Sequence, residues 1–461
     1  MFILRRSIME TDKSQSSAKT TPSLFRTIWR WHFYAGIIIA PFLVILSVTG
    51  GVYLFKPQIE QVLYKDFYQV HPDGEKMLAS RQFEEVKKLY PEGVLTTYRP
   101  GEKADRSSEV GISLNGKSLT IFIDPYTARF IGELNNDDRI MDKIEEFHGE
   151  LMAGTLGDRI VELVACWAVV LIITGIYLWF PKKAQSLSGL LVPRFNKGKR
   201  TFFRDLHAVP AFWIAAGMFF LIMTGLPWSG LWGTQFQTLA TNSGSGYPPS
   251  VWVGDAPVSG LKTKEIADVP WAAENLDVPE SKIEGFITLP IDHVVEVANR
   301  EDIHPSYTVI IPQDEKGVYT LSAFPPRAQD EATIHIDQYT GAVLADYRYD
   351  NYGTLGKIVA WGITLHKGTQ FGFPNQIISL VICIGIVFVS LSGFYLWIRR
   401  KPKGKLGAPR APRILKKKSF LLLIIILGIL FPLVGLSLIG VWLLDLMIIQ
   451  KIPAVKKFMN A

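Results

Sequence analysis

Residues 31–55 have the sequence WHFYAGIIIAPFLVILSVTGGVYLF, and this stretch decides the class of fold. After Trp31 and His32 it contains no Asp, Glu, Lys or Arg. A helix of about 20 apolar residues crosses the roughly 30 Å hydrocarbon core of a bilayer. The stretch is therefore predicted to be a membrane span, which excludes an ordinary cytosolic enzyme and a disordered chain.

Four more apolar blocks follow, at residues 160–180, 208–228, 377–398 and 420–446. Pro432 lies inside the last block and Asp445 near its end, so this block is predicted to form either one tilted, kinked helix or a re-entrant hairpin. The two cysteines, Cys166 and Cys383, lie inside apolar blocks. Neither a disulfide framework nor a cysteine-based zinc site is therefore expected.

Positive charge is concentrated in three short segments beside these blocks, within a chain of 49 Lys+Arg and 42 Asp+Glu. Their basic residues are Arg5, Arg6, Lys13, Lys19, Arg26 and Arg30; Lys182, Lys183, Arg194, Lys197, Lys199, Arg200 and Arg204; and Arg399, Arg400, Lys401, Lys403, Lys405, Arg410, Arg413, Lys416, Lys417 and Lys418. The positive-inside rule places all three segments in the cytoplasm. Since membrane topology explains the charge, no nucleic-acid binding is expected. Five full spans would put the basic tail with Lys451, Lys456 and Lys457 outside, against the rule.

The chain contains an internal repeat. The segment Thr120–Thr127 matches Thr333–Thr340, and Trp31-His32 with Thr49-Gly50 matches Leu206-His207 with Thr224-Gly225. A third match links Phe147-His148, Thr174-Gly175 and Tyr177-Leu178-Trp179 to Leu365-His366, Ser392-Gly393 and Tyr395-Leu396-Trp397. Each half is thus predicted to consist of a span, an outer segment and a second span, in the manner of a parallel repeat.

The predicted fold is a membrane α-helical bundle of four core spans plus a C-terminal fifth, duplicated, with two small α+β outer domains. Its segments are a cytoplasmic arm 1–32; spans 33–55, 159–180, 207–228, 377–398 and 419–447; outer domains 56–158 and 229–376; basic loops 181–206 and 399–418; and a tail 448–461. In the outer domains the patterns predict helices at 80–89 and 291–299 and strands at 94–98, 109–114, 118–124, 307–311, 318–323, 333–337 and 343–347.

Four of the eight histidines, His32, His148, His207 and His366, occupy repeat-related positions at or just before a span. The predicted topology places His32 and His207 near the cytoplasmic face and His148 and His366 near the outer face. A pseudo-two-fold axis would bring each pair together, and two histidines from facing helices suit the axial positions of a haem. Two such haems would form an electron path across the membrane. No catalytic residue is assigned.

A purely structural interpretation of these histidines is also available, because a single histidine at a membrane interface commonly acts as an amphipathic anchor. Matched placement of four of them favours the functional interpretation. No C-x-x-C-H occurs, so covalently attached haem is excluded. No dinucleotide or nucleotide motif occurs either, so electrons must come from a quinol, a soluble donor or a partner protein.

These motifs resemble those of the PepSY-associated transmembrane proteins. The resemblance is carried by Trp31-His32 with Thr49-Gly50, Leu206-His207 with Thr224-Gly225, Ile123–Thr127, and Leu365-His366 with Tyr395–Trp397, and it covers about residues 25–445. It implies a multi-pass protein of the bacterial inner membrane, with a cytoplasmic N-terminus and periplasmic PepSY domains. It further implies two b-type haems bound by His32, His148, His207 and His366, and reduction of siderophore-bound Fe(III) to Fe(II).

The sequence therefore favours a transmembrane haem-dependent ferric (siderophore) reductase, with the lipid bilayer, a ferric chelate and an unidentified electron donor as partners. One alternative is a non-redox, membrane-anchored PepSY protein whose outer domains bind a peptide, a protease or a partner. A transporter for iron chelates ranks last, because the spans offer few polar residues.

Overall fold

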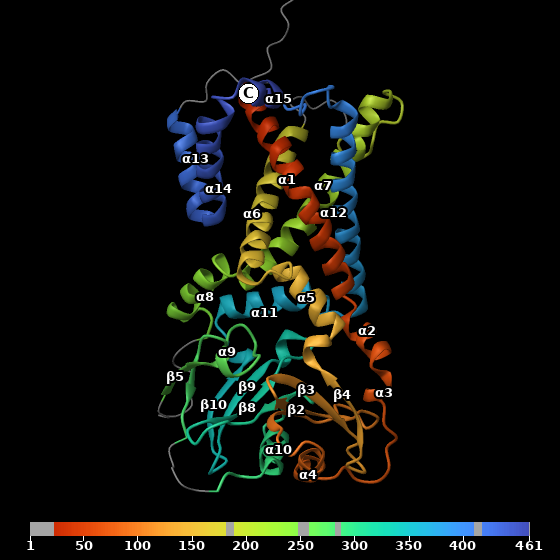
Figure 1. Ribbon diagram of the computed structural model, residues 1–461, viewed down its shortest axis with the longest axis vertical. Helices are drawn as coiled ribbons and strands as arrows, with labels where there is room; N and C mark the ends of the chain where they lie inside the picture. The colour runs from red at the N-terminus through yellow and green to blue at the C-terminus, as the bar shows by residue number, and fades with distance from the viewer. Residues whose placement is uncertain (1–22, 181–188, 248–257, 282–286, 410–416, 461) are drawn as a thin grey trace, which may run out of the picture. The chain divides into compact units, whose positions relative to one another are not determined.

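The computed structural model describes residues 23–180, 189–247, 258–281, 287–409 and 417–460. The predicted loop and arm residues at positions 5, 6, 13, 19, 182, 183, 410, 413 and 416 lie outside these ranges. Within them, five helical stretches are long and apolar enough to cross a membrane (Figure 1). They are Leu24–Tyr53 in α1 (Ser23–Tyr53), Gly154–Trp179 (α6), Lys199–Trp228 in α7 (Lys199–Gly225) and the turn η2 (Leu226–Trp228), Phe373–Arg400 (α12), and Pro432–Ile449, which begins with α14 (Pro432–Leu444).

The chain divides into two compact units, which are described separately. Unit 1 contains residues 1–40, 170–209 and 392–461, and unit 2 contains residues 41–169 and 210–391. The helices α1, α6, α7 and α12 each contribute residues to both units. Each unit therefore holds one end of every one of these four helices.

In unit 1, the last apolar block is a pair of helices, α13 (Lys417–Leu430) and α14, which lie side by side (Figure 1). The single span predicted at 419–447 is therefore corrected to a hairpin, which was the other interpretation of this block. Pro432 disfavours helical geometry at the residue before it, and Phe431 has φ −140° and ψ 86°. The helices meet at two glycines, because a Cβ on Gly435 would lie 2.5 Å from the Cα of Gly428.

The tail after this hairpin returns to the start of α1. Its last helix, α15 (Pro453–Met459), is followed by Asn460, whose carbonyl accepts a hydrogen bond of 3.0 Å from the Arg30 guanidinium. The Tyr34 hydroxyl donates to the carbonyl of Met459 at 2.9 Å. The basic tail therefore lies at the end of unit 1 that holds Arg30, which removes its conflict with the charge pattern.

This hairpin predicts that the tail and the start of α1 are accessible from the same side of the membrane. Single cysteines at Lys457 and Leu24, both exposed, should react with a membrane-impermeant maleimide from the same side of sealed vesicles. Background labelling should be low, because Cys166 and Cys383 are buried. Labelling of the two positions from opposite sides would contradict the hairpin.

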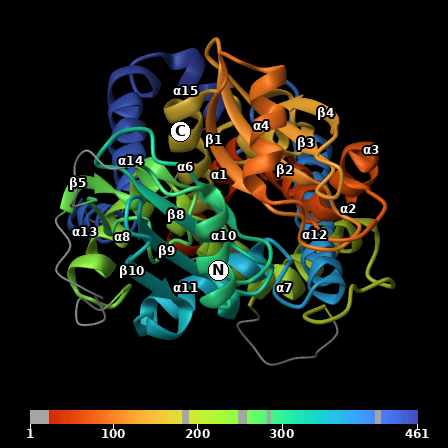
Figure 2. The same cartoon turned by 90° about the horizontal axis from the view of Figure 1, so that it is seen from below.

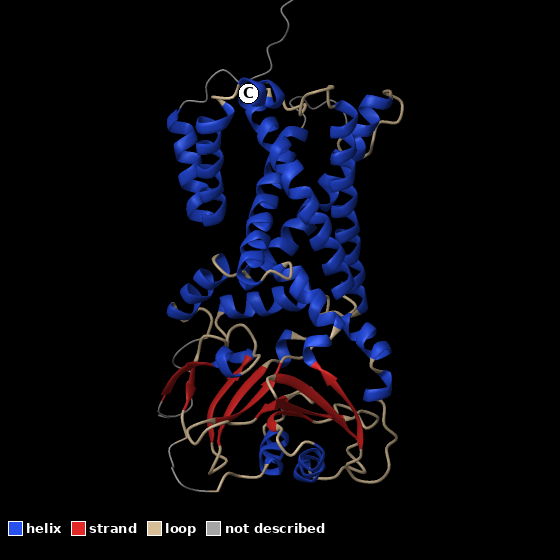
Figure 3. Ribbon diagram, in the orientation of Figure 1, coloured by secondary structure: helices blue, strands red, loops and turns tan. Residues whose placement is uncertain are grey.

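Unit 2 contains an antiparallel sheet that, in the described part of the chain, has eight strands in the order β10-β9-β8-β7-β1-β2-β3-β4 (Figure 3). The strands are β1 (Val94–Arg99), β2 (Ser108–Leu114), β3 (Lys117–Ile123), β4 (Phe130–Asn135), β7 (Thr308–Ile310), β8 (Val318–Ala323), β9 (Ala332–Asp337) and β10 (Val343–Arg348). A separate pair comprises β5 (Val258–Lys262) and β6 (Asp277–Pro279). The strand predictions of the outer segments are confirmed to within two residues at each end.

The sequence predicted a separate small sheet in each outer segment, and this prediction is wrong. Strand β1 of the first pairs with β7 of the second, with Tyr98 opposite Val309, so four strands from each segment make one sheet. This pairing covers two edge strands that would otherwise expose unpaired backbone groups. The strand order is symmetric, since each half presents its first strand of this sheet, β1 or β7, at the centre.

Helices cover both faces of this sheet (Figures 1 and 2). On one face, α4 (Ala79–Leu89) and α10 (Ile291–Arg300) contact each other and pack on an apolar core that includes Ile334 and Ile336. On the other face, α8 (Trp232–Asn242) and α11 (Thr354–His366) pack on a second core that includes Tyr347. Because strand residues alternate between faces, the second face also receives Thr333 and His335 of β9.

Glu331, just before β9, predicts a pH-dependent stability. Its side chain is buried, and burial raises the pKa of this carboxyl from 4.5 to about 8, although Tyr352 and Lys367 act in the opposite direction. The unfolded chain ionises above pH 4.5 while the folded chain keeps the proton, so stability should fall between pH 4.5 and 8, by an amount of the order of 4 kcal/mol. Glu331→Gln should remove this slope in thermal unfolding, whereas Glu315→Gln, at an exposed position, should keep it.

Candidate cofactor sites

The histidines predicted to lie near the outer face, His148 and His366, are neighbours in unit 2. His148 lies in α5 (Ile140–Glu150) and His366 ends α11. Their ring centroids are 6.4 Å apart, with an interplanar angle of 61°. A metal–nitrogen bond of about 2 Å, with about 1 Å more to each ring centre, puts the centroids of two imidazoles that share a metal about 6 Å apart. The separation of this pair, the outer pair, therefore fits one metal ion between the rings.

A hydroxyl from a membrane span holds each ring of the outer pair. The Nδ1 atom of His148 lies 3.0 Å from Oγ1 of Thr49 in α1. The Nδ1 atom of His366 lies 3.0 Å from Oγ1 of Thr224 in α7. Since Nδ1 is engaged in both rings, Nε2 is the nitrogen left for a ligand bond.

The other predicted pair, His32 and His207, forms an inner pair in unit 1 with the same kind of contact. Nδ1 of His32 in α1 lies 2.9 Å from Oγ1 of Thr174 in α6, and Nδ1 of His207 in α7 lies 3.2 Å from Oγ of Ser392 in α12. His207 lies close enough to His32 to interact with it electrostatically. Each unit thus contains two of the four repeat-related histidines, and each of these is bonded to a hydroxyl of a neighbouring helix.

Each hydroxyl residue is followed by a glycine that lies against the same ring. A Cβ built on this glycine would be in van der Waals contact with the ring carbon Cε1, or closer. The distances are 2.9 Å for Gly50 and His148, 3.0 Å for Gly393 and His207, 3.2 Å for Gly175 and His32, and 3.2 Å for Gly225 and His366. The glycines therefore allow each imidazole to approach the backbone of the helix that bonds it.

In the sequence these Thr-Gly and Ser-Gly pairs mark the repeat, and their contact with the histidines was not predicted. The signal was present, because every repeated histidine has a repeated hydroxyl-glycine pair. What the repeat could not show is the partner of each ring. His32 bonds to Thr174 and not to Thr49 of its own helix, and Thr49 bonds to His148.

The donor set of these sites suits a haem better than a bare metal ion. In the described ranges, no group of three or more His, Cys, Asp or Glu residues could hold a metal ion. A protein-only transition-metal site needs three or four such ligands. A haem brings four nitrogens of its own and needs only two axial ligands, which a pair of histidines provides.

The outer pair is also in the protonation state that binds metal. Burial, with a smaller contribution from the neighbouring His148, lowers the pKa of His366 to about 4. Burial lowers the pKa of His148 as well. Neutral imidazole is the ligand form of histidine, so both rings can bind a metal at physiological pH.

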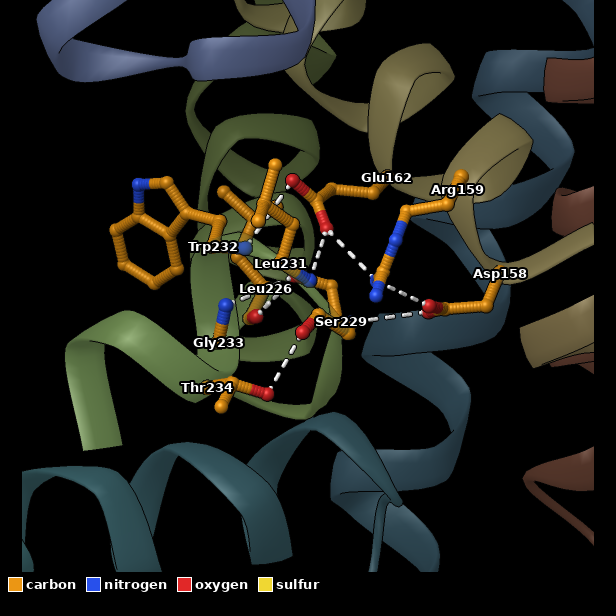
Figure 4. A network of polar contacts seen from close by, with 10 residues as sticks. Asp158, Arg159, Glu162, Leu226, Ser229, Leu231, Trp232, Gly233 and Thr234 are labelled. Atoms are coloured by element: carbon orange, nitrogen blue, oxygen red, sulfur yellow. Dashed lines mark hydrogen bonds and ion pairs between the residues drawn. The ribbon is translucent and has the colours of Figure 1, made fainter. Parts of the chain in front are cut away.

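A polar network fixes the chain just after Thr224-Gly225 (Figure 4). The carboxylate of Glu162 in α6 accepts hydrogen bonds from the backbone N–H groups of Leu231 at 2.8 Å and Trp232 at 3.2 Å, where α8 begins. Asp158 accepts from the N–H of Gly230 at 3.0 Å and from Arg159 at 2.6 Å. The first turn of a helix has unpaired N–H groups, so Glu162 satisfies two of them from a neighbouring helix.

Glu162 was overlooked in the sequence, although it stands inside the second apolar block. An ionisable residue within a span is costly and therefore informative. Its carboxylate is completely buried, and its neighbour Arg159 lies 3.9 Å away. Its two backbone partners give it a positioning role in the segment that joins α7 to α8.

The fold defines a multi-pass helical membrane protein, and its helices bring the side chains of His148 and His366 together. The model of the PepSY-associated TM region family matches residues 29–400, and the chain belongs to this family. A search of curated proteins finds no match.

Proposed function

We propose that the protein is a di-haem electron-transfer protein of the bacterial inner membrane that reduces a ferric chelate on its outer side. The observation that carries this proposal is the outer pair, whose ring centroids are 6.4 Å apart and whose Nδ1 atoms are both hydrogen-bonded. In this proposal His148 and His366 bind one b-type haem, and His32 and His207 bind the other. A haem supplies a one-electron Fe(III)/Fe(II) couple at each site.

The chain's own residues bind, orient and shield the two sites. The helix α1 contributes His32 to the inner pair and Thr49 to the outer pair, and α7 contributes His207 and Thr224 in the same way. A shift of either helix would therefore change both sites. This sharing supports two sites that act together and not two independent ones.

The direction of electron flow follows from the charge pattern. The basic segments place the N-terminus in the cytoplasm, so the inner pair lies on the cytoplasmic side and the outer pair on the periplasmic side. The position of the tail beside Arg30 supports this orientation, because Lys451, Lys456 and Lys457 then join the other basic residues. The donor is a quinol or a cytoplasmic reductant.

The acceptor in this proposal is a ferric chelate, and a siderophore complex is the form that the family resemblance suggests. Lys367, next to His366, has its Nζ 4.7 Å from the ring centre of Phe324 and 6.0 Å from that of Trp228. A cation among aromatic rings thus adjoins the outer pair. Such a setting suits a bulky chelate with aromatic or anionic groups. One electron converts its Fe(III) to Fe(II), which the chelate holds less tightly.

Sealed vesicles test this function directly. The purified protein is placed in liposomes with dithionite trapped inside, a ferric hydroxamate or ferric catecholate outside, and an impermeant Fe(II) indicator outside. Fe(II) should form only in vesicles that contain the haem-loaded protein, and a protein-free vesicle is the control. Haem-loaded protein that passes no electrons to either chelate would contradict the proposed acceptor.

A further inference from the structure

The four hydroxyl-glycine pairs are the feature from which a further role follows. We infer that Thr49, Thr174, Thr224 and Ser392 are positioning residues that keep the proton of each histidine on Nδ1 and turn Nε2 toward the haem iron. The inference rests on the proposed function and deepens it, because it names the residues that control ligand strength at both sites. None of the four touches the iron in this arrangement.

At three of these residues the hydroxyl lies within hydrogen-bond distance of a carbonyl of its own helix. Oγ1 of Thr49 donates to the carbonyl of Ile45 at 2.9 Å, and Oγ1 of Thr174 donates to the carbonyl of Val170 at 2.7 Å. Oγ1 of Thr224 donates to the carbonyl of Phe220 at 2.8 Å. A hydroxyl has one proton and two lone pairs, so a hydroxyl that donates to its own helix carbonyl contacts the histidine through a lone pair.

The tautomer of each histidine follows from this assignment. A lone pair can only accept a hydrogen bond, so Nδ1 is the protonated ring nitrogen and donates to the threonine. A neutral imidazole carries one proton, which leaves Nε2 with a free lone pair. The threonine thus selects the tautomer that binds a metal through Nε2. The hydroxyl of a threonine in a span already has a hydrogen-bond acceptor in the carbonyl of its own helix, so it does not require a histidine as a partner.

The glycines fix the other degree of freedom, the position of the ring. Any side chain at Gly50 would place a Cβ 2.9 Å from Cε1 of His148, which is closer than unstrained carbon atoms approach. The ring is therefore held by a hydrogen bond at Nδ1 and by the glycine backbone that lies beside Cε1. The same arrangement occurs at all four histidines and on four helices. Such recurrence in both units indicates a requirement of the cofactor sites and not of one local packing contact.

The hydrogen bond also determines how strongly the imidazole binds iron. A partner that accepts the Nδ1 proton increases the electron density on Nε2, which favours Fe(III) over Fe(II) and lowers the reduction potential. Loss of such partners weakens metal binding by about 10-fold to 100-fold in other metal sites. If the affinity for the ferric iron falls tenfold relative to that for the ferrous iron, the reduction potential rises by about 59 mV for one electron.

The test is a spectroelectrochemical titration of Thr224→Val beside Thr224→Ser. Valine keeps the shape of threonine and removes the hydroxyl, and serine keeps the hydroxyl. Thr224→Val should raise the potential of one haem by about 59 mV or more, or release that haem, while the other haem keeps its potential. Thr224→Ser should resemble the wild type. The haem of the inner pair is an internal control for folding in the same sample.

Each outcome of this titration has a distinct meaning. Two haems at wild-type potentials in Thr224→Val would overturn the inference and leave the proposed function intact. A wild-type protein without haem would overturn the proposed function itself. If Thr224→Val does not fold, Thr174→Val tests the same role at the inner pair, where the haem of the outer pair is the control.

Discussion

Replacing His148 with alanine is expected to remove one of the two haems and to abolish reduction of an external ferric chelate. In the proposed function His148 and His366 would hold one haem together. Their ring centroids lie 6.4 Å apart, and no group of three or more His, Cys, Asp or Glu residues in the described ranges could hold a metal instead. The inner pair lies in the other unit and keeps both of its ligands. The pyridine haemochrome count should therefore fall from about two per chain to about one.

A matched control for this variant is His293→Ala. His293 is a half-exposed histidine of unit 2 that lies in α10 and pairs with Glu296 at 3.6 Å. This control should keep both haems and full activity. Full activity and full haem content in His148→Ala would contradict the pairing of His148 with His366.

Replacing Glu162 with alanine is expected to produce the largest loss of stability. The change removes the carboxylate that accepts from two partly buried backbone N–H groups, those of Leu231 and Trp232. Each group that loses its acceptor costs about 1–3 kcal/mol, so a loss of about 2–6 kcal/mol is expected. The affected segment follows Thr224-Gly225, so the haem of the outer pair should be released at a lower temperature than that of the inner pair.

Thermal unfolding in detergent, followed by haem absorbance and by circular dichroism, measures both effects. Glu162→Gln keeps one acceptor oxygen and should lose less stability than Glu162→Ala. Glu146→Ala, at an exposed position in α5, should leave the melting curve unchanged. Equal melting of Glu162→Ala and the wild type would contradict the capping role of this carboxylate.

Much of the fold could be predicted from sequence because its signals are periodic and local. The uncharged block after His32 and the three basic segments required spans, and alternating patterns such as that of β3 required strands. The outer pair could be anticipated as well, since His148 and His366 are repeated and the charge pattern placed both near one face. The rings do lie side by side.

The remaining features depend on contacts between distant segments. The pairing of β1 with β7 joins two outer segments through Tyr98 and Val309, and neither strand shows its partner in its own pattern. Pro432 predicted either a kinked helix or a hairpin. The hairpin is identified by the contact between Gly428 of α13 and Gly435 of α14, which the sequence does not show. The bond from His32 to Thr174 likewise needs two helices to be neighbours, which a repeat alone does not establish.

The most direct test of the central claim is an ultraviolet–visible spectrum of the detergent-purified protein, oxidised and then reduced with dithionite, with a pyridine haemochrome count. We expect a Soret band that sharpens on reduction and about two b-type haems per chain. A colourless protein purified from haem-replete cells would contradict it and would shift attention to the sheet of unit 2 as the functional part of the chain.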